Sequence, residues 1–330
     1  MAGFAGLRNA TITKYFALAA AAEEGNRDIF QHPVIQEIIG RNQRYRLAMK
    51  MANATASRSS LIGLKSLVLA ATGEGSDAAP STISVTNRDL ATARNNLIFS
   101  LGDDEISRIP EMAGLASVAS MSLERNPTPS EMAAMQILGE AAYWATINRM
   151  MALIRALATG WGTDYCTTGT DMSDDKLQAG RDGIVDAGGR GRLLVMDTRP
   201  SLNHWRADIK TMLGAITLHQ IGQKAVDTGA TVVINDVADG VDWAVDPNMP
   251  VVVGDTDGQM IAAGAVELKV ETPKIQEGAQ LIGVIGDPSA PLATIERRRA
   301  AGSTTILSVV SWLAAGVLDA NLGKRGRHAT

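Results

Sequence analysis

The stretch TPSEMAAMQILGEAAYWATINRMMALIRALATG, residues 128–160, predicts one long α-helix. Thr128 is a good N-cap, Pro129 fits the first helical turn, and Glu131 follows the cap by three residues, which is the spacing of a capping box. Apolar side chains recur at spacings of three and four, the period of a helix: Met132, Met135, Leu138, Ala142, Ile147, Met150, Met151, Ile154 and Leu157. At about 1.5 Å per residue the helix is roughly 45 Å long, which exceeds the usual length of about three or four turns.

The end of this helix is expected at Thr159-Gly160-Trp161-Gly162, where a glycine can take the left-handed C′ conformation. Few charged residues lie within the stretch, so other protein surfaces must cover much of the helix. The charged residues are Glu131, Glu140, Arg149 and Arg155. Two interpretations stay open: a long core helix, or a rod that also packs against neighbouring subunits.

The composition limits the class of protein. A chain of 330 residues can bury a sizeable core in about one to three domains. The net charge of −4 and the pI near 5.6 argue against a dedicated nucleic-acid binder, which is usually basic. Cys166 is the only cysteine, which excludes an internal disulfide framework and suits a reducing cytosol.

No stretch has the pattern of a targeting or membrane segment. The N-terminus lacks the three regions of a secretory signal peptide. The longest apolar patches, residues 16–22 and 306–318, are too short or interrupted to match the run of about 18 apolar residues that spans a membrane. We therefore expect neither secretion nor membrane insertion.

The first part of the chain predicts an arm followed by an extended hairpin. Residues 1–59 form a largely helical arm with a basic run at Arg41, Arg44, Arg46 and Lys50. This run is either a solvated face or a surface that seats on an acidic neighbour or on phosphate. Residues 60–101 predict a long hairpin whose tip, residues 72–80, is rich in turn formers. Because an isolated two-stranded ribbon is marginally stable in water, the hairpin should lie on something else.

The second half alternates helices and strands. Ser173 is expected to cap a helix whose first turn carries Asp174 and Asp175, which match the helix dipole. Further segments are predicted as a strand at 192–196, a helix at 200–209, strands at 231–235, 250–254, 260–271, 281–285 and 293–299, an apolar run at 304–318 and a basic end at 324–328. An acidic loop is expected at 236–248. If subunits assemble symmetrically, we expect this loop near a symmetry axis of the assembly. This order predicts an α+β domain with a mixed sheet.

No catalytic, cofactor-binding or metal-binding constellation emerges from the sequence. The histidines, His32, His204, His219 and His328, have no metal-ligand spacing. Gly188–Gly191 precedes a strand and predicts a turn, and Asp255–Gly258 lacks the later ligands of a calcium loop. Cys166 has no convincing base nearby in the sequence. We therefore predict no catalytic residues, no cofactor and no metal.

Several segments resemble the tailed-bacteriophage major capsid proteins with the Hong Kong phage fold. They are Thr170-Asp-Met-Ser-Asp-Asp-Lys-Leu177, Gly189-Arg-Gly-Arg-Leu-Leu-Val-Met-Asp-Thr-Arg-Pro200 and His204-Trp205, which resemble the axial domain of that family. The resemblance implies an N-terminal arm (1–59), an extended-loop hairpin (60–101), a peripheral domain with a spine helix (102–164, helix 128–160), an axial domain (165–290) and a return to the peripheral domain with a C-terminal tail (291–330).

The resemblance also implies a function. The subunit would assemble through pentamers and hexamers into the icosahedral shell around double-stranded DNA, in the host bacterial cytoplasm, and would reside in the virion. Its partners would be itself, portal and scaffolding proteins, a decoration protein, and DNA contacted non-specifically, without a membrane and without enzymatic activity. Two alternatives stay open: an encapsulin-like nanocompartment shell, which shares this fold, and a soluble α+β enzyme.

Overall fold

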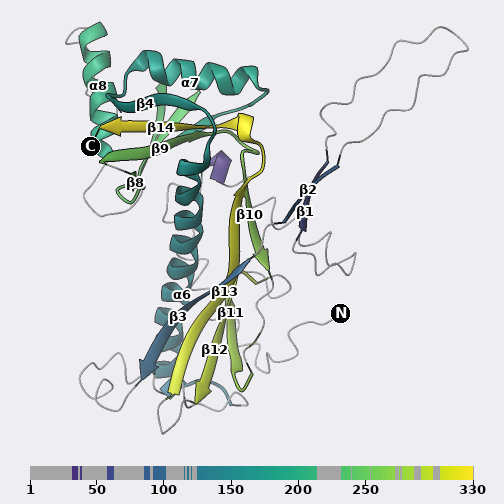
Figure 1. The fold of residues 1–330 in the computed structure, drawn as a ribbon. Coiled ribbons are helices and arrows are strands. Elements are labelled where there is room, and N and C mark those ends of the chain that lie inside the picture. The colour runs from purple at the N-terminus through teal and green to yellow at the C-terminus, as the bar shows by residue number, and fades with distance from the viewer. Residues whose placement is uncertain are drawn as a thin grey trace, which may run out of the picture.

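The computed structural model joins two β-sheets through one long helix. It describes residues 32–35, 38, 58–62, 85–89, 92–101, 115, 117–118, 120, 125–213, 232–238, 240–252, 254–271, 275, 277–285, 291–299 and 305–329. The helix α6 (Pro129–Ala156) runs from the five-stranded sheet to the seven-stranded sheet (Figure 1). The seven-stranded sheet carries α7 (Asp174–Asp186) and α8 (Arg199–Leu213), which completes the predicted α+β architecture.

The predicted capping box at the start of α6 is confirmed. The Thr128 side chain accepts from the Glu131 backbone N–H at 3.3 Å, and the Glu131 carboxylate accepts from the Thr128 N–H at 2.8 Å. Glu131 also pairs with Arg125 and accepts from the Ser117 hydroxyl at 2.8 Å. The hydrogen bond from Arg125 is the main reason that the pKa of Glu131 is lowered to about 2, although the carboxylate is buried.

The predicted left-handed glycine at the end of α6 is wrong. The helix instead tightens into a 3₁₀ turn at Leu157–Gly160, and Trp161 follows in an extended conformation. Gln259 supplies the missing cap, because its side-chain N–H donates to the Ile154 carbonyl at 3.1 Å. The same amide accepts from the Trp161 indole N–H at 2.9 Å, so a buried side chain far along the chain ends the helix.

The seven-stranded sheet is mixed, as the sequence predicts. Its order is β4 (Asp164–Thr170), β14 (Gly323–Ala329), β9 (Asp255–Ile261), β5 (Leu193–Asp197), β7 (Val241–Val245) and β6 (Val232–Ala238), with β8 (Val251–Val252) on β9. The β14–β4 and β5–β7 pairs are parallel, and the other pairs are antiparallel. Trp205 of α8 packs against Trp243 of β7 with ring centroids 6.4 Å apart.

The five-stranded sheet is antiparallel and packs against α6. Its order is β10 (Val266–Glu271), β13 (Thr305–Val317), β12 (Ala293–Arg299) and β11 (Gln280–Ile285), and β3 (Ala93–Leu101) also pairs with β13. One apolar core follows the helix into both sheets. Its α6 members include Met135, Leu138, Ala142, Ile147, Met150, Met151 and Ile154, all buried.

The division of the strands between the two sheets differs from the one that the sequence predicted. The expected strand 260–271 is two strands, because the turn after Ile261 contains Gly264 at φ +90° and sends β10 into the other sheet. Consequently β10 and β11, predicted within 165–290, pair in the five-stranded sheet. The basic end at 324–328 is instead β14, a central strand of the seven-stranded sheet. The division of the chain into domains stays a prediction.

The acidic loop expected at 236–248 is also wrong. This segment is a tight hairpin of β6 and β7 that turns at Gly240, which has φ +73°. Asp242 and Asp246 are almost fully buried because arginines neutralise them, Arg192 in the first case and Arg155 in the second. Asp255–Gly258, predicted as a turn, is part of β9.

The base of the extended hairpin is present. β1 (Arg58–Ile62) and β2 (Val85–Asp89) pair antiparallel, in a register that runs from Arg58 opposite Asp89 to Ile62 opposite Val85. The predicted tip at 72–80 and the basic run at 41–50 lie outside the described residues. The end of the predicted return strand, β3, leaves the ribbon and joins β13.

Replacing Thr128 by alanine should lower the free energy of unfolding by about 1 kcal/mol, because the first turn of α6 loses its cap. Thr159→Ala is the matched control, since Thr159 is exposed and bonds only the nearby Ala156 carbonyl at 3.2 Å. Urea unfolding followed by circular dichroism measures both variants. Equal losses would contradict a specific role for the capping box.

Candidate functional site

The structure places the histidines considered in the sequence analysis in separate environments. His32 donates to the Asp242 carboxylate at 2.8 Å, and His204 lies 3.3 Å from Asp171. His219 lies outside the described residues. In the part of the chain that the structure describes, no group of three or more His, Cys, Asp or Glu side chains can hold a metal ion, and no helix is long and apolar enough to cross a membrane. Gly188 and Gly191 have positive φ angles, which fits the predicted turn.

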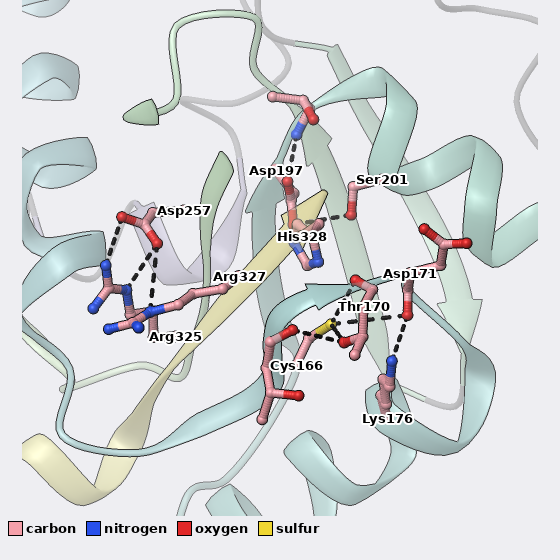
Figure 2. A network of polar contacts seen from close by, with 12 residues as sticks. Cys166, Thr170, Asp171, Lys176, Asp197, Ser201, Asp257, Arg325, Arg327 and His328 are labelled. Carbon is pink, nitrogen blue, oxygen red and sulfur yellow. Dashed lines mark hydrogen bonds and ion pairs between the residues drawn. The ribbon is translucent and has the colours of Figure 1, made fainter. Parts of the chain in front are cut away.

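The largest set of buried charges surrounds β14 (Figure 2). Arg325 donates to both carboxylate oxygens of Asp257 at 2.9 and 2.7 Å, a bidentate pair between neighbouring strands. His328 bonds Asp197 of β5, whose carboxylate also accepts from the Ser201 hydroxyl at 3.1 Å. Gly258 permits this approach, because a Cβ there would collide with the Asp197 carboxylate.

Sequence reasoning missed this network, since 324–328 looked like a solvated basic tail. The segment Gly323-Lys-Arg-Gly-Arg-His328 did contain one signal of close packing. Two glycines within an otherwise polar segment indicate close approach of neighbouring groups, and Gly323 lies directly against the Trp161 ring. The acidic partners lie about 70 and 130 residues earlier, so no local pattern reveals them.

The network also contains the thiol of Cys166. Burial opposes ionisation of Cys166, but the nearby imidazole of His328 and the Thr170 hydroxyl, 3.4 Å from the sulfur, outweigh it, so the pKa of the thiol is lowered. Burial alone would lower the pKa of His328, but the charge and hydrogen bond of Asp197 raise it to about 9. His328 therefore lies near Cys166, which the sequence did not suggest, but no hydrogen bond between the two side chains is found in the described part of the chain.

This Cys–His–Asp arrangement is closed to substrates in the structure. Cys166 is 1% exposed, and His328 and Asp197 are both 0% exposed. A nucleophilic thiol must be reached by its substrate, and catalytic cysteines are usually partly exposed. The His328–Asp197 contact therefore acts here as a polar link between β14 and β5.

Two further ion pairs connect the outer segments to the seven-stranded sheet. Arg155, in the last turn of α6, pairs with Asp246 directly after β7. Asp242 of β7 is paired with Arg192 and also accepts from His32 of the arm. The arm residues Val34, Ile35 and Ile38 are buried in the main core. The described part of the arm is therefore held by packing and by a charged hydrogen bond.

The exposed surface includes a strand edge, at β3, and a hollow beside it. β3 pairs with β13 on one side, and no other described strand pairs with it. Leu97 and Ile98 on this edge are 38% and 47% exposed. A hollow of about 420 Å³ opens beside it between β3, α6 and β13, lined by Arg94, Asn95, Asn96, Leu97, Ala145, Thr146, Arg149, Val309 and Ser311. The β1–β2 ribbon stands apart from both sheets (Figure 1).

Comparisons with known proteins concern the fold. No family model matches the chain, and a search of curated proteins finds no match. Among solved structures, a structure of Mycobacterium phage Che8 is similar with 12% identity and a TM-score of 0.45, over 84% of this chain and 87% of that one. The holo-SrpI encapsulin complex from Synechococcus elongatus has 9% identity and a TM-score of 0.45, over 82% of each chain. The capsid of the native GTA particle has 10% identity and a TM-score of 0.43, over 84% and 86%.

The described elements have the order predicted for the Hong Kong phage-type fold. They comprise the base of an extended hairpin, a long spine helix between two sheets, and a mixed sheet with two helices. The order of the described elements therefore agrees with the architecture expected from the sequence.

Replacing Arg325 by methionine should lower the free energy of unfolding by about 3–5 kcal/mol, because Asp257 stays buried without its partner. Arg327→Met is the matched control, because the Arg327 side chain is 36% exposed and lies 3.9 Å from Asp257. Its loss should be below about 1 kcal/mol. Chemical denaturation measures both, and equal effects would contradict the role given to the buried pair.

The His328–Asp197 pair should make stability depend on pH. The pKa of His328 is raised from 6.5 to about 9 on folding, so its contribution is complete below pH 6.5 and is lost as the pH rises through about 9. The loss is on the order of 3 kcal/mol. The lowered pKa of Cys166 acts in the opposite sense, so the measurement belongs in a Cys166→Ala background. Adding His328→Gln should flatten the profile between pH 6.5 and 9.5, and an unchanged slope would refute the assignment.

Proposed function

We propose that this protein is the major capsid protein of a tailed bacteriophage. Subunits assemble through pentamers and hexamers into an icosahedral shell that encloses double-stranded DNA. The protein is not an enzyme, resides in the virion, and is assembled in the host bacterial cytoplasm. Its partners are other copies of itself, portal and scaffolding proteins, and a decoration protein.

The observation that carries this proposal is the β1–β2 ribbon, which pairs with no other strand in the described part of the chain. Two strands of five residues each pair with one another and stand apart from both sheets (Figure 1). A ribbon of this kind is marginal in water and exposes backbone groups that invite another chain. Copies of the same subunit can cover it through heterologous contacts that close by symmetry.

The edge of β3 supports the same conclusion. Its exposed Leu97 and Ile98 are apolar side chains on a strand edge, which is a liability for a free subunit. The rigid body behind this edge suits a shell subunit, because α6 and the main core continue without interruption from one sheet into the other. The mild net charge of −4 suits loose, non-specific contact with DNA that must later leave.

Deleting residues 72–80, the predicted hairpin tip, should abolish shell assembly and leave the helix content unchanged, because α6, α7 and α8 lie elsewhere in the chain. Light scattering and negative-stain microscopy measure particle size, and far-UV circular dichroism measures helicity. The control replaces residues 73–77 by glycine and serine at constant length. It keeps the length with which the hairpin could reach a neighbouring subunit and removes the side chains of the tip. Shells of normal size from the deletion variant would contradict the role of the hairpin.

The size and content of these particles distinguish the proposed function from its two alternatives. Closed shells that contain DNA when expressed with the other phage proteins support the proposal. Closed shells that hold a protein cargo without DNA support an encapsulin-like compartment. A stable monomer or dimer under all conditions supports a soluble α+β enzyme.

A further inference from the structure

The outer edge of β3 is long and partly apolar. β3 pairs with β13 along all nine of its residues, and no other strand in the described part of the chain pairs with its outer side. Backbone N–H and C=O groups along such an edge can bond a further strand. Leu97 and Ile98, at the middle of β3, are 38% and 47% exposed, so the edge also presents apolar side chains.

The hollow between β3, α6 and β13 gives this edge room for another strand. Leu97 lines the hollow together with Val309, its register partner on β13, and with Thr146 of α6. The volume of the hollow is about 420 Å³. A strand added to β3 would therefore find hydrogen-bonding groups for its backbone and space for its side chains on the α6 side.

The sequence of β3 is complementary to itself in the antiparallel direction. Leu97 is the middle residue of β3, so placing it opposite Leu97 of a second copy pairs all nine residues of both strands. The two leucines, with Cβ atoms about 4.5–5.5 Å apart, then cover each other. Arg94 lies opposite Ser100 in this register, so no charged residue of β3 faces a like charge.

The charges around β3 favour the same direction of pairing. Arg94 lies near the start of the strand, and Arg149 of α6 donates to Asn95 at 2.6 Å. Three acidic residues at 103–105 follow the end of β3 in the sequence and lie outside the described residues. Antiparallel pairing directs the basic start of one strand toward the acidic segment of the other, which complements their charges. Both arginines also have contacts within their own chain, so their charges orient the pairing, and the backbone bonds and the apolar centre stabilise it.

We propose that β3 pairs with β3 of a second copy across a two-fold axis at Leu97, so that two five-stranded sheets form one continuous sheet. The inference rests on the proposed function and names a contact within it. A two-fold contact uses the same patch on both subunits and joins only two of them. Because it cannot build a ring of five or six subunits, it joins subunits of neighbouring rings and thereby closes the shell.

The first test replaces Leu97 by lysine in the full chain. Two lysines would then lie opposite each other at the axis, where like charges destabilise a strand pair. Free pentamers and hexamers should remain, while closed shells decrease at least about tenfold, as counted by native mass spectrometry and negative-stain microscopy. Ile137→Lys is the matched control, because Ile137 is an exposed apolar residue of α6 that does not line the hollow, and this variant should assemble like the wild type.

The second test measures the register by disulfide formation. In a Cys166→Ala background, Leu97→Cys places two thiols opposite each other across the axis, close to the Cβ separation that a disulfide needs. Ala93→Cys is the control, because the two copies of Ala93 would lie eight residues apart along the strands, or about 27 Å. Mild oxidation of assembled shells should give disulfide-linked dimers of the Leu97→Cys variant but not of the Ala93→Cys variant, on a non-reducing gel.

The outcomes separate the inference from the function on which it rests. Normal shells from the Leu97→Lys variant overturn the inference alone, and so does the loss of its pentamers and hexamers. A Leu97→Cys variant that forms shells without cross-linking also overturns it, because another segment then covers the edge of β3. Equal cross-linking of the Ala93→Cys variant overturns the register and the inference with it.

A wild-type chain that stays monomeric under all conditions overturns the proposed function and the inference together. Circular dichroism shows that each variant is folded before it is scored.

Discussion

The last turn of α6 is bonded to the seven-stranded sheet, and the relation between the two sheets depends on this junction. Arg155 pairs with Asp246 beyond β7, while Gln259 of β9 binds the Ile154 carbonyl and the Trp161 indole. A second link runs alongside, where the Leu318 N–H donates to the Ala265 carbonyl at 2.8 Å as the chain leaves β13. Both links lie within one continuous apolar core, and a large apolar interface opposes hinge motion between the sheets.

Buried charge determines which distant strands meet. Among the described residues, six carboxylates are at most 1% exposed. Five have an arginine or histidine partner, namely Glu131, Asp197, Asp242, Asp246 and Asp257, and the sixth, Glu296, accepts from the Thr294 hydroxyl at 3.1 Å. Desolvation offsets much of the attraction within a buried pair, so such pairs add little net stability compared with apolar side chains of the same shape. A lone buried charge is costly, however. We infer that these pairs act on specificity, because only the native register gives every carboxylate its partner.

Features with local causes could be predicted from the sequence. The cap at Thr128, the period of the spine helix, the acidic start of α7 and the turn at Gly188 all depend on residues within a few positions of each other. The base of the extended hairpin and the strand at 293–299 followed from composition and alternation. These signals were sufficient for the architecture.

Features with distant causes could not be predicted. β14 looked like a tail because its charges find their partners only after β5 and β9 are in place. The acidic segment looked like a loop because nothing near Asp242 in the sequence announces Arg192 or His32. The base near Cys166 escaped notice for the same reason, since His328 comes from the far end of the described chain. A polar run therefore indicates a solvated surface only when no complementary charge is available elsewhere.

Ion pairs contribute differently in the interior of the molecule and at its surface. A buried pair such as Arg325–Asp257 has little water to compete with it, so it fixes a strand for the lifetime of the fold. A pair near the surface, such as Arg181–Asp182 at 3.7 Å, is screened by salt and contributes about 0–1 kcal/mol. The buried pairs therefore determine which strands meet, whereas a pair near the surface such as Arg181–Asp182 could be lost with little effect on the fold.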